Sequence, residues 1–113
     1  MQIAEARHGA VAVLAPAGRI DSTTVGVLEA RLAAILAAPA PRLIVDFSGV
    51  EYISSAGLRV LLVAARRVKD TGGGLALCGL GGAVHQVFQL AGFLPLFTIC
   101  ETRDAALAQL APP

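Results

Sequence analysis

The six residues RLIVDF (Arg42–Phe47) constrain the fold more than any other stretch of the chain. They form a nearly continuous apolar run with β-branched members, interrupted only by Asp46. Such a run is typical of a strand covered on both faces, whereas a strand with one solvated face alternates apolar and polar residues. The run therefore predicts a central strand, with Asp46 near its carboxyl end, where α/β sheets tend to place functional groups.

Segments with helical periodicity flank this strand, because their apolar residues recur at spacings of three and four. A first helix is expected after Asp21–Thr23, whose short side-chain oxygens can accept hydrogen bonds from a helix start. The second runs from Ser55 to Asp70–Gly74 (DTGGG), the third closes at Gly92, and the last follows Thr102. The chain thus alternates helices with short apolar runs.

Further strands are expected at both ends of the chain. Gln2–Ala6 and the segment AVAVLAPAG are predicted to form two strands joined by a tight turn at His8 and Gly9. Pro16 lacks a backbone donor, so the second strand is expected to end or bend there. LALC and LFTIC are two more short strands, while Ser48 to Tyr52 is read as a loop. Strand–helix alternation predicts one α/β domain over residues 1–113, with a mixed sheet and crossover helices.

Charge and composition narrow the function classes. Nine basic and eight acidic residues leave a net charge of +1, which indicates neither nucleic acid nor an anionic membrane as partner. No apolar run is long enough to span a membrane, and Met1–Gly9 lacks the apolar core of a signal peptide. Cys78 and Cys100 have no metal-ligand spacing, and we interpret them as buried free thiols. We expect a cytoplasmic protein with no metal and no cofactor.

No catalytic residue is predicted. SSAG lacks the glycine that precedes serine in a nucleophile elbow, and neither His8 nor His85 is placed to act as its base. GLGG (Gly79–Gly82) has no following Lys-Ser/Thr and no full dinucleotide fingerprint, so we interpret it as a strand–helix turn. A small hydrolase therefore remains only as a weak alternative.

The pair Ser54–Ser55 admits two interpretations. Serine is among the best helix N-caps, so the pair could simply begin the second helix. A hydroxyl at a helix start also lies beside free backbone N–H groups and the positive end of the helix dipole, which suit a phosphate. Spacing alone leaves both interpretations open.

Three segments together resemble one known family. APAGRID, LIVDFSGVEYISSAGLRVLLVAARRVKDTGGGLALCGL and VFQLAGFLPLFTICETRDAAL are similar, in this order, to the STAS domain of anti-sigma-factor antagonists and of sulphate-transporter tails. The resemblance covers nearly the whole chain. It implies a mixed sheet of four or five strands with helices packed mainly on one face and the N-terminal strand at an edge.

The resemblance also implies a site. Phosphorylatable antagonists typically carry Asp-Ser-Ser-Gly in the strand–helix loop, and the first serine accepts the phosphate. Alignment on Gly57 places Ser55 at the acceptor and Ser54 at the family's aspartate, so Ser54 is the second choice. The implied surroundings of the acceptor are Asp21, Asp46, Ser54, Ala56, Gly57 and Leu58.

The function implied by the resemblance is partner switching. The unphosphorylated chain would bind a serine-kinase anti-sigma factor, which then phosphorylates it with ATP, and a phosphatase would reset it. An alternative is a constitutive STAS subunit of a transporter or a stress-sensing complex, without phosphorylation. A nucleotide-sensing module that uses Asp21 and the Ser55 loop is a further alternative. An apolar surface would also permit self-association.

Overall fold

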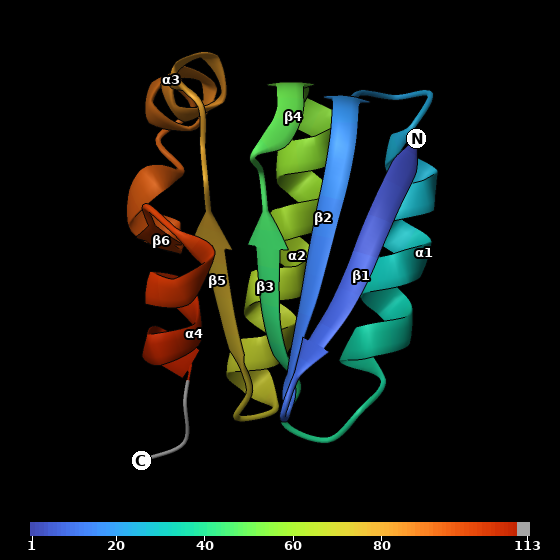
Figure 1. Cartoon of the computed structure of the whole chain (residues 1–113). Coiled ribbons are helices and arrows are strands. Elements are labelled where there is room, and N and C mark those ends of the chain that lie inside the picture. The colour runs from blue at the N-terminus through green and yellow to red at the C-terminus, as the bar shows by residue number, and fades with distance from the viewer. Residues whose placement is uncertain (111–113) are drawn as a thin grey trace.

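A six-stranded sheet with helices on both faces makes up residues 1–110, which are the residues that the computed structural model describes (Figure 1). The strands are β1 (Gln2–His8), β2 (Val11–Ile20), β3 (Arg42–Asp46), β4 (Gly49–Ile53), β5 (Gly74–Cys78) and β6 (Thr98–Cys100). The helices are α1 (Val25–Leu36), α2 (Ser55–Asp70), α3 (Gly82–Leu90) and α4 (Arg103–Leu110), with a 3₁₀ turn, η1, at Leu94–Leu96.

The apolar run that begins at Arg42 forms the middle of the sheet. The strand order is β1-β2-β3-β5-β6, and β4 pairs with β2 beside this path. Only β1 and β2 are antiparallel, and all the other pairs are parallel. Leu43, Ile44 and Val45 of β3 are fully buried, as a strand covered on both faces requires. The predicted central strand is confirmed.

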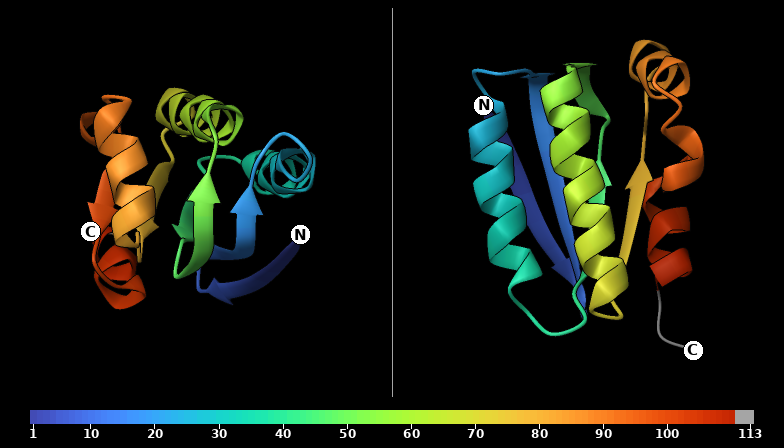
Figure 2. Two further views of the ribbon diagram at one scale, coloured as in Figure 1. Left: turned by 90° about the horizontal axis from the view of Figure 1, so that it is seen from above. Right: turned by 180° about the vertical axis from the view of Figure 1, so that it is seen from behind.

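Two apolar cores lie on opposite faces of the sheet. The larger core joins β-strand side chains to α1, α2 and α3, and its largest buried members include Phe47 and Phe88. The smaller core joins Val13, Ile44 and Cys78 to Ala106 of α4. Viewed from above, α1 and α2 lie on one side of the sheet and α4 on the other (Figure 2). The predicted packing of helices mainly on one face is confirmed.

Strand β4 was expected as a loop. Its residues run parallel to the upper half of β2, with Ala17 opposite Gly49 and Ile20 opposite Ile53. The lower half of β2 pairs instead with β3, from Val11 to Leu14. The ten-residue β2 therefore pairs with two short strands, β3 and then β4, along its length. The sheet has six strands, one more than the upper limit of the four or five implied by the resemblance. This arrangement carries the end of β4 above the end of β3 (Figure 1).

The expectation that β2 ends at Pro16 is wrong. β2 continues to Ile20, and its register shift lies between Gly18 and Arg19. Pro16 falls between the ladder to β3, which ends at Leu14, and the ladder to β4, which begins at Ala17. Pro16 stands opposite Ile3 of β1, but neither parallel ladder includes it, so its missing N–H removes no hydrogen bond from either of those two ladders.

The helix starts follow the sequence with one difference. α4 begins as predicted, since Thr102 Oγ1 accepts a hydrogen bond of 3.1 Å from the N–H of Ala105. α1 starts only at Val25, and its N-cap Thr24 makes no side-chain cap bond. Asp21 instead closes the preceding turn, with its carboxylate accepting from the N–H of Thr23 at 3.0 Å. None of the helices in residues 1–110 has the length and apolar content needed to cross a membrane.

Candidate functional site

Ser54 links the end of β4 to the start of α2. Its backbone is extended, with φ −88° and ψ 171°, and its N–H donates to the carbonyl of Ile20 at 2.8 Å. Its Oγ accepts from the N–H of Gly57 at 3.3 Å, and its carbonyl accepts from the N–H of Leu58 at 3.0 Å. Ser54 therefore caps α2, as local chemistry predicted, and its half-buried hydroxyl already has a partner.

Ser55 is the first residue of α2 and is exposed to solvent. Its hydroxyl takes part in none of the side-chain hydrogen bonds among residues 1–110. The N–H groups of Ser55 and Ala56 lie in the first turn, where a helix offers no carbonyl acceptor. An accessible hydroxyl thus stands beside two free backbone donors at the positive end of the α2 dipole.

Gly57 and Leu58 fix how the first turn of α2 meets the sheet. A Cβ at Gly57 would lie 2.7 Å from Ile20 Cγ2 and 2.8 Å from Ile53 Cγ1, closer than packed carbons tolerate. The glycine therefore lets the helix approach the ends of β2 and β4. Leu58 is buried in the larger core, while Ala56 stays half-buried.

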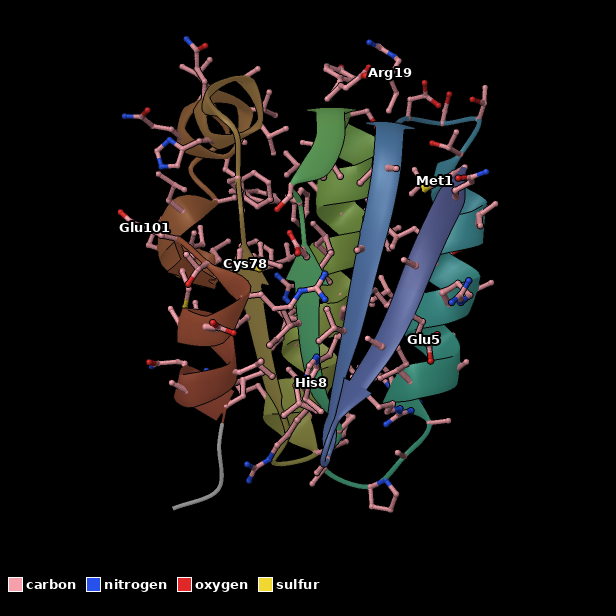
Figure 3. All side chains as sticks on the ribbon, viewed as in Figure 1. Met1, Glu5, His8, Arg19, Cys78 and Glu101 are labelled. Carbon is pink, nitrogen blue, oxygen red and sulfur yellow. The ribbon has the colours of Figure 1, made fainter. Side chains whose placement is uncertain are left out.

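Asp21 lies at the same edge of the sheet, directly after the residue that holds Ser54. Its Oδ1 accepts from Thr23 Oγ1 at 2.7 Å, and hydrogen bonds from Thr23 and Thr24 hold the pKa of this carboxyl below its ordinary value. Arg19 contributes an ion pair, with 3.8 Å between Nε and Asp21 Oδ2. Arg19 extends at the upper edge of the molecule in Figure 3, with its guanidinium 4.4 Å from the ring centroid of Tyr52.

Asp46 does not lie with Asp21, Ser54 and Ser55. Its Oδ2 accepts from Arg103 Nε at 3.1 Å and Nη2 at 2.9 Å, while its Oδ1 accepts from Ser48 N at 2.9 Å and Ser48 Oγ at 2.5 Å. It belongs to the face covered by α4, whereas its neighbour Phe47 packs in the larger core with α2. The structure thus brings Asp21, Ser54 and Ser55 together and holds Asp46 on the other side of the sheet.

Burial and hydrogen bonding act in opposite directions on Asp46. Desolvation of the buried carboxyl favours its neutral form, but the hydrogen bonds from Ser48 and the Arg103 guanidinium outweigh it and lower the pKa. Asp46 in turn affects Cys78, which lies opposite it on β5. Burial, assisted by the negative charge of Asp46, raises the pKa of the Cys78 thiol to about 11. A thiol of this kind is a poor nucleophile at neutral pH.

The other titratable candidates remain scattered. His8 and His85 are both exposed, at the β1–β2 turn and on α3. Cys78 is buried as expected, but Cys100 is only half-buried. Among the described residues, no three His, Cys, Asp or Glu side chains gather closely enough to hold a metal ion.

Two contacts in the structure were not predicted from the sequence. Arg103 sits 57 positions after its partner Asp46, and no local pattern marks such a pair. The stack of Arg19 on Tyr52 depends on β4 lying beside β2, where the two residues are register partners. Only the recognition of β4 as a strand, from its β-branched and aromatic residues, could have indicated the second contact.

Fold and site together make a small α/β domain with an exposed serine hydroxyl at one edge of its sheet. The family model of the STAS domain matches residues 2–106. The chain belongs to the STAS domain family.

Similar proteins carry related names. A Bordetella bronchiseptica protein, BtrV, named as a candidate anti-sigma factor antagonist, is 41% identical over 91 residues, which cover 80% of this chain and 78% of that protein. The anti-sigma-F factor antagonist RsfB of Mycobacterium tuberculosis is 28% identical over 102 residues, which cover 90% of this chain and 83% of that protein. The crystal structure of an anti-sigma factor antagonist from Mycobacterium paratuberculosis has a TM-score of 0.87 at 28% identity. The match covers 96% of this chain and 92% of that one.

Proposed function

We propose that this chain is an anti-sigma-factor antagonist whose binding is switched off by phosphorylation of Ser55. The observation that carries the proposal is the exposed Ser55 hydroxyl, which has no internal hydrogen-bond partner among residues 1–110 and opens α2. The names of similar proteins support the antagonist role. In this role the chain is a ligand and a kinase substrate rather than a catalyst.

Local geometry favours Ser55 over Ser54 as acceptor. Phosphorylation of Ser54 would remove the cap bond to Gly57 and place a dianion at a half-buried position. Phosphorylation of Ser55 leaves that cap intact. In the transfer, the Ser55 Oγ–P bond forms, the bond between the γ-phosphorus and the bridging oxygen of ATP breaks, and the hydroxyl proton leaves to a base of the kinase or to solvent.

The proposed docking surface is the exposed side of α2 that continues from Ser55. Arg59 and Arg66 are exposed there, and Val63 between them is 58% exposed although it is apolar. Leu62 lines a hollow of about 240 Å³ on one flank of this surface. A serine-kinase anti-sigma factor that covers this surface would meet a dianion after modification, and desolvation and repulsion would then weaken the complex.

The decisive experiment combines a kinase assay with site mapping. The purified chain is incubated with ATP and the serine-kinase anti-sigma factor from the same cell, and any phosphate is located by mass spectrometry. We expect one phosphate on Ser55 that is absent from Ser55→Ala, with Ser54→Ala as the matched control that still accepts phosphate. A kinase that binds the chain but never modifies it would overturn the switch and favour the constitutive-subunit alternative.

A further inference from the structure

Arg59 is an exposed cation one helical turn beyond the proposed acceptor. Residues four apart lie on the same side of a helix, with their Cβ atoms about 5–6 Å apart. Within residues 1–110 the ion pairs involve only Arg19, Arg31 and Arg103, so the Arg59 guanidinium is uncommitted. It can therefore reach a group attached to Ser55 without giving up another partner.

The first turn of α2 offers no competing anion. It contains no acidic residue, so a phosphate on Ser55 would be the first negative charge carried by this turn of the helix. Arginine binds phosphate through two parallel N–H···O bonds, which are stronger than bonds between neutral groups. The nearby carboxylate of Asp21 is already engaged by Thr23 and Arg19.

We propose that Arg59 binds the phosphate of Ser55 within the same helix, which withdraws this cation from the exposed side of α2. The inference rests on the proposed phosphorylation of Ser55. Modification would then change two features of the surface at once, because it adds a dianion and occupies the first of the exposed cations Arg59, Arg66 and Lys69. A partner that uses Arg59 in the unmodified state loses that contact on phosphorylation.

The test uses the full chain with phosphoserine incorporated at position 55 during translation, so it needs no kinase. The second ionisation of the phosphate, which ordinarily has a pKa of about 6, is followed by ³¹P NMR. Pairing with Arg59 favours the dianion, so we expect this pKa to be about 0.2–0.4 lower in the unaltered chain than in Arg59→Gln. The difference should shrink in 1 M salt, where exposed charges are screened.

Matched variants separate pairing from general charge. Arg66→Gln removes another exposed cation two turns further along α2 and should leave the phosphate pKa unchanged, while Arg59→Lys should give an intermediate value. The elements around the start of α2 also carry Arg19, Asp21, Glu29 and Glu51, whose charges are the same in all these variants.

Two results would overturn the inference: an Arg59→Gln titration that coincides with that of the unaltered chain, or an equal shift in Arg66→Gln. Failure of the kinase to modify Ser55 is a different outcome, because it removes the proposed function and leaves the measured pairing unaffected.

Discussion

The start of α2 and the group formed by Asp46, Ser48 and Arg103 both place polar side chains at the end of a parallel strand. The two regions differ in what those side chains do. Asp46 is 8% exposed and its carboxylate is bound by Ser48 and by Arg103 of α4. At the end of β4, Ser54 satisfies the helix start while Ser55 is left free. Position at a strand end therefore does not define a functional group. What distinguishes the two regions is whether the polar atoms are already saturated.

The largest effect is expected from Asp46→Ala. This change leaves the Arg103 guanidinium and the Ser48 N–H without their acceptor, and we expect the free energy of unfolding to fall by about 2–3 kcal/mol. Urea unfolding followed by circular dichroism measures it. Asp21→Ala, at the exposed edge of the sheet, should lower the free energy of unfolding much less. Equal losses in the two variants would show that the bonds of Asp46 contribute no more to stability than those of Asp21.

Gly57→Ala should give the next largest effect. The added Cβ meets Ile20 and Ile53 at 2.7 and 2.8 Å, and overpacking of this kind typically costs about 1–3 kcal/mol. Gly26→Ala in α1 is the matched control, because a Cβ there meets nothing within 4 Å, and we expect it to be neutral or stabilising by about 0.4–1 kcal/mol. Equal thermal melting temperatures for the two variants would contradict the close approach of α2 to the sheet.

Replacing Ser54 and replacing Ser55 should have opposite effects on stability and on phosphate incorporation. Ser54→Ala removes the N-cap and is expected to cost about 1 kcal/mol, whereas Ser55→Ala should change stability by less than about 0.5 kcal/mol. Phosphate incorporation should show the opposite order, being lost in Ser55→Ala and retained in Ser54→Ala. Chemical denaturation and intact mass spectrometry on the same preparations measure both quantities, and a destabilised Ser55→Ala chain would argue for a structural role of this hydroxyl.

The smallest expected effect is the acid dependence that Asp46 confers. Its pKa in the folded chain is lowered from the ordinary value of 3.8, so its contribution is present above that value and is lost as pH falls through the folded pKa. Urea midpoints between pH 5 and pH 2.5 should therefore fall less steeply in Asp46→Asn than in the unaltered chain. Parallel curves would show that Asp46 does not govern this part of the acid transition.

Features that depend on neighbouring residues were predictable from the sequence, and features that depend on residues far apart in the chain were not. Local patterns predicted the central strand, the helix of Ser55–Asp70 and the capping role of Ser54, because each depends on residues close together in the chain. The place of Asp46 could not be predicted, because its partner Arg103 comes from the far end of the chain. β4 was missed because Ser48 and Gly49 suggested a loop, while its pairing with β2 is a long-range property.

The hydrogen bond from Ser54 N–H to the Ile20 carbonyl has a consequence for any enzyme that acts on Ser55. It ties the residue before Ser55 to the carboxyl end of β2, and Ser55 itself is already helical. Such a serine cannot extend into a kinase cleft as a flexible peptide does. A kinase that modifies it must recognise the intact domain, and a synthetic peptide spanning residues 49–62 should be a far poorer substrate than the folded chain.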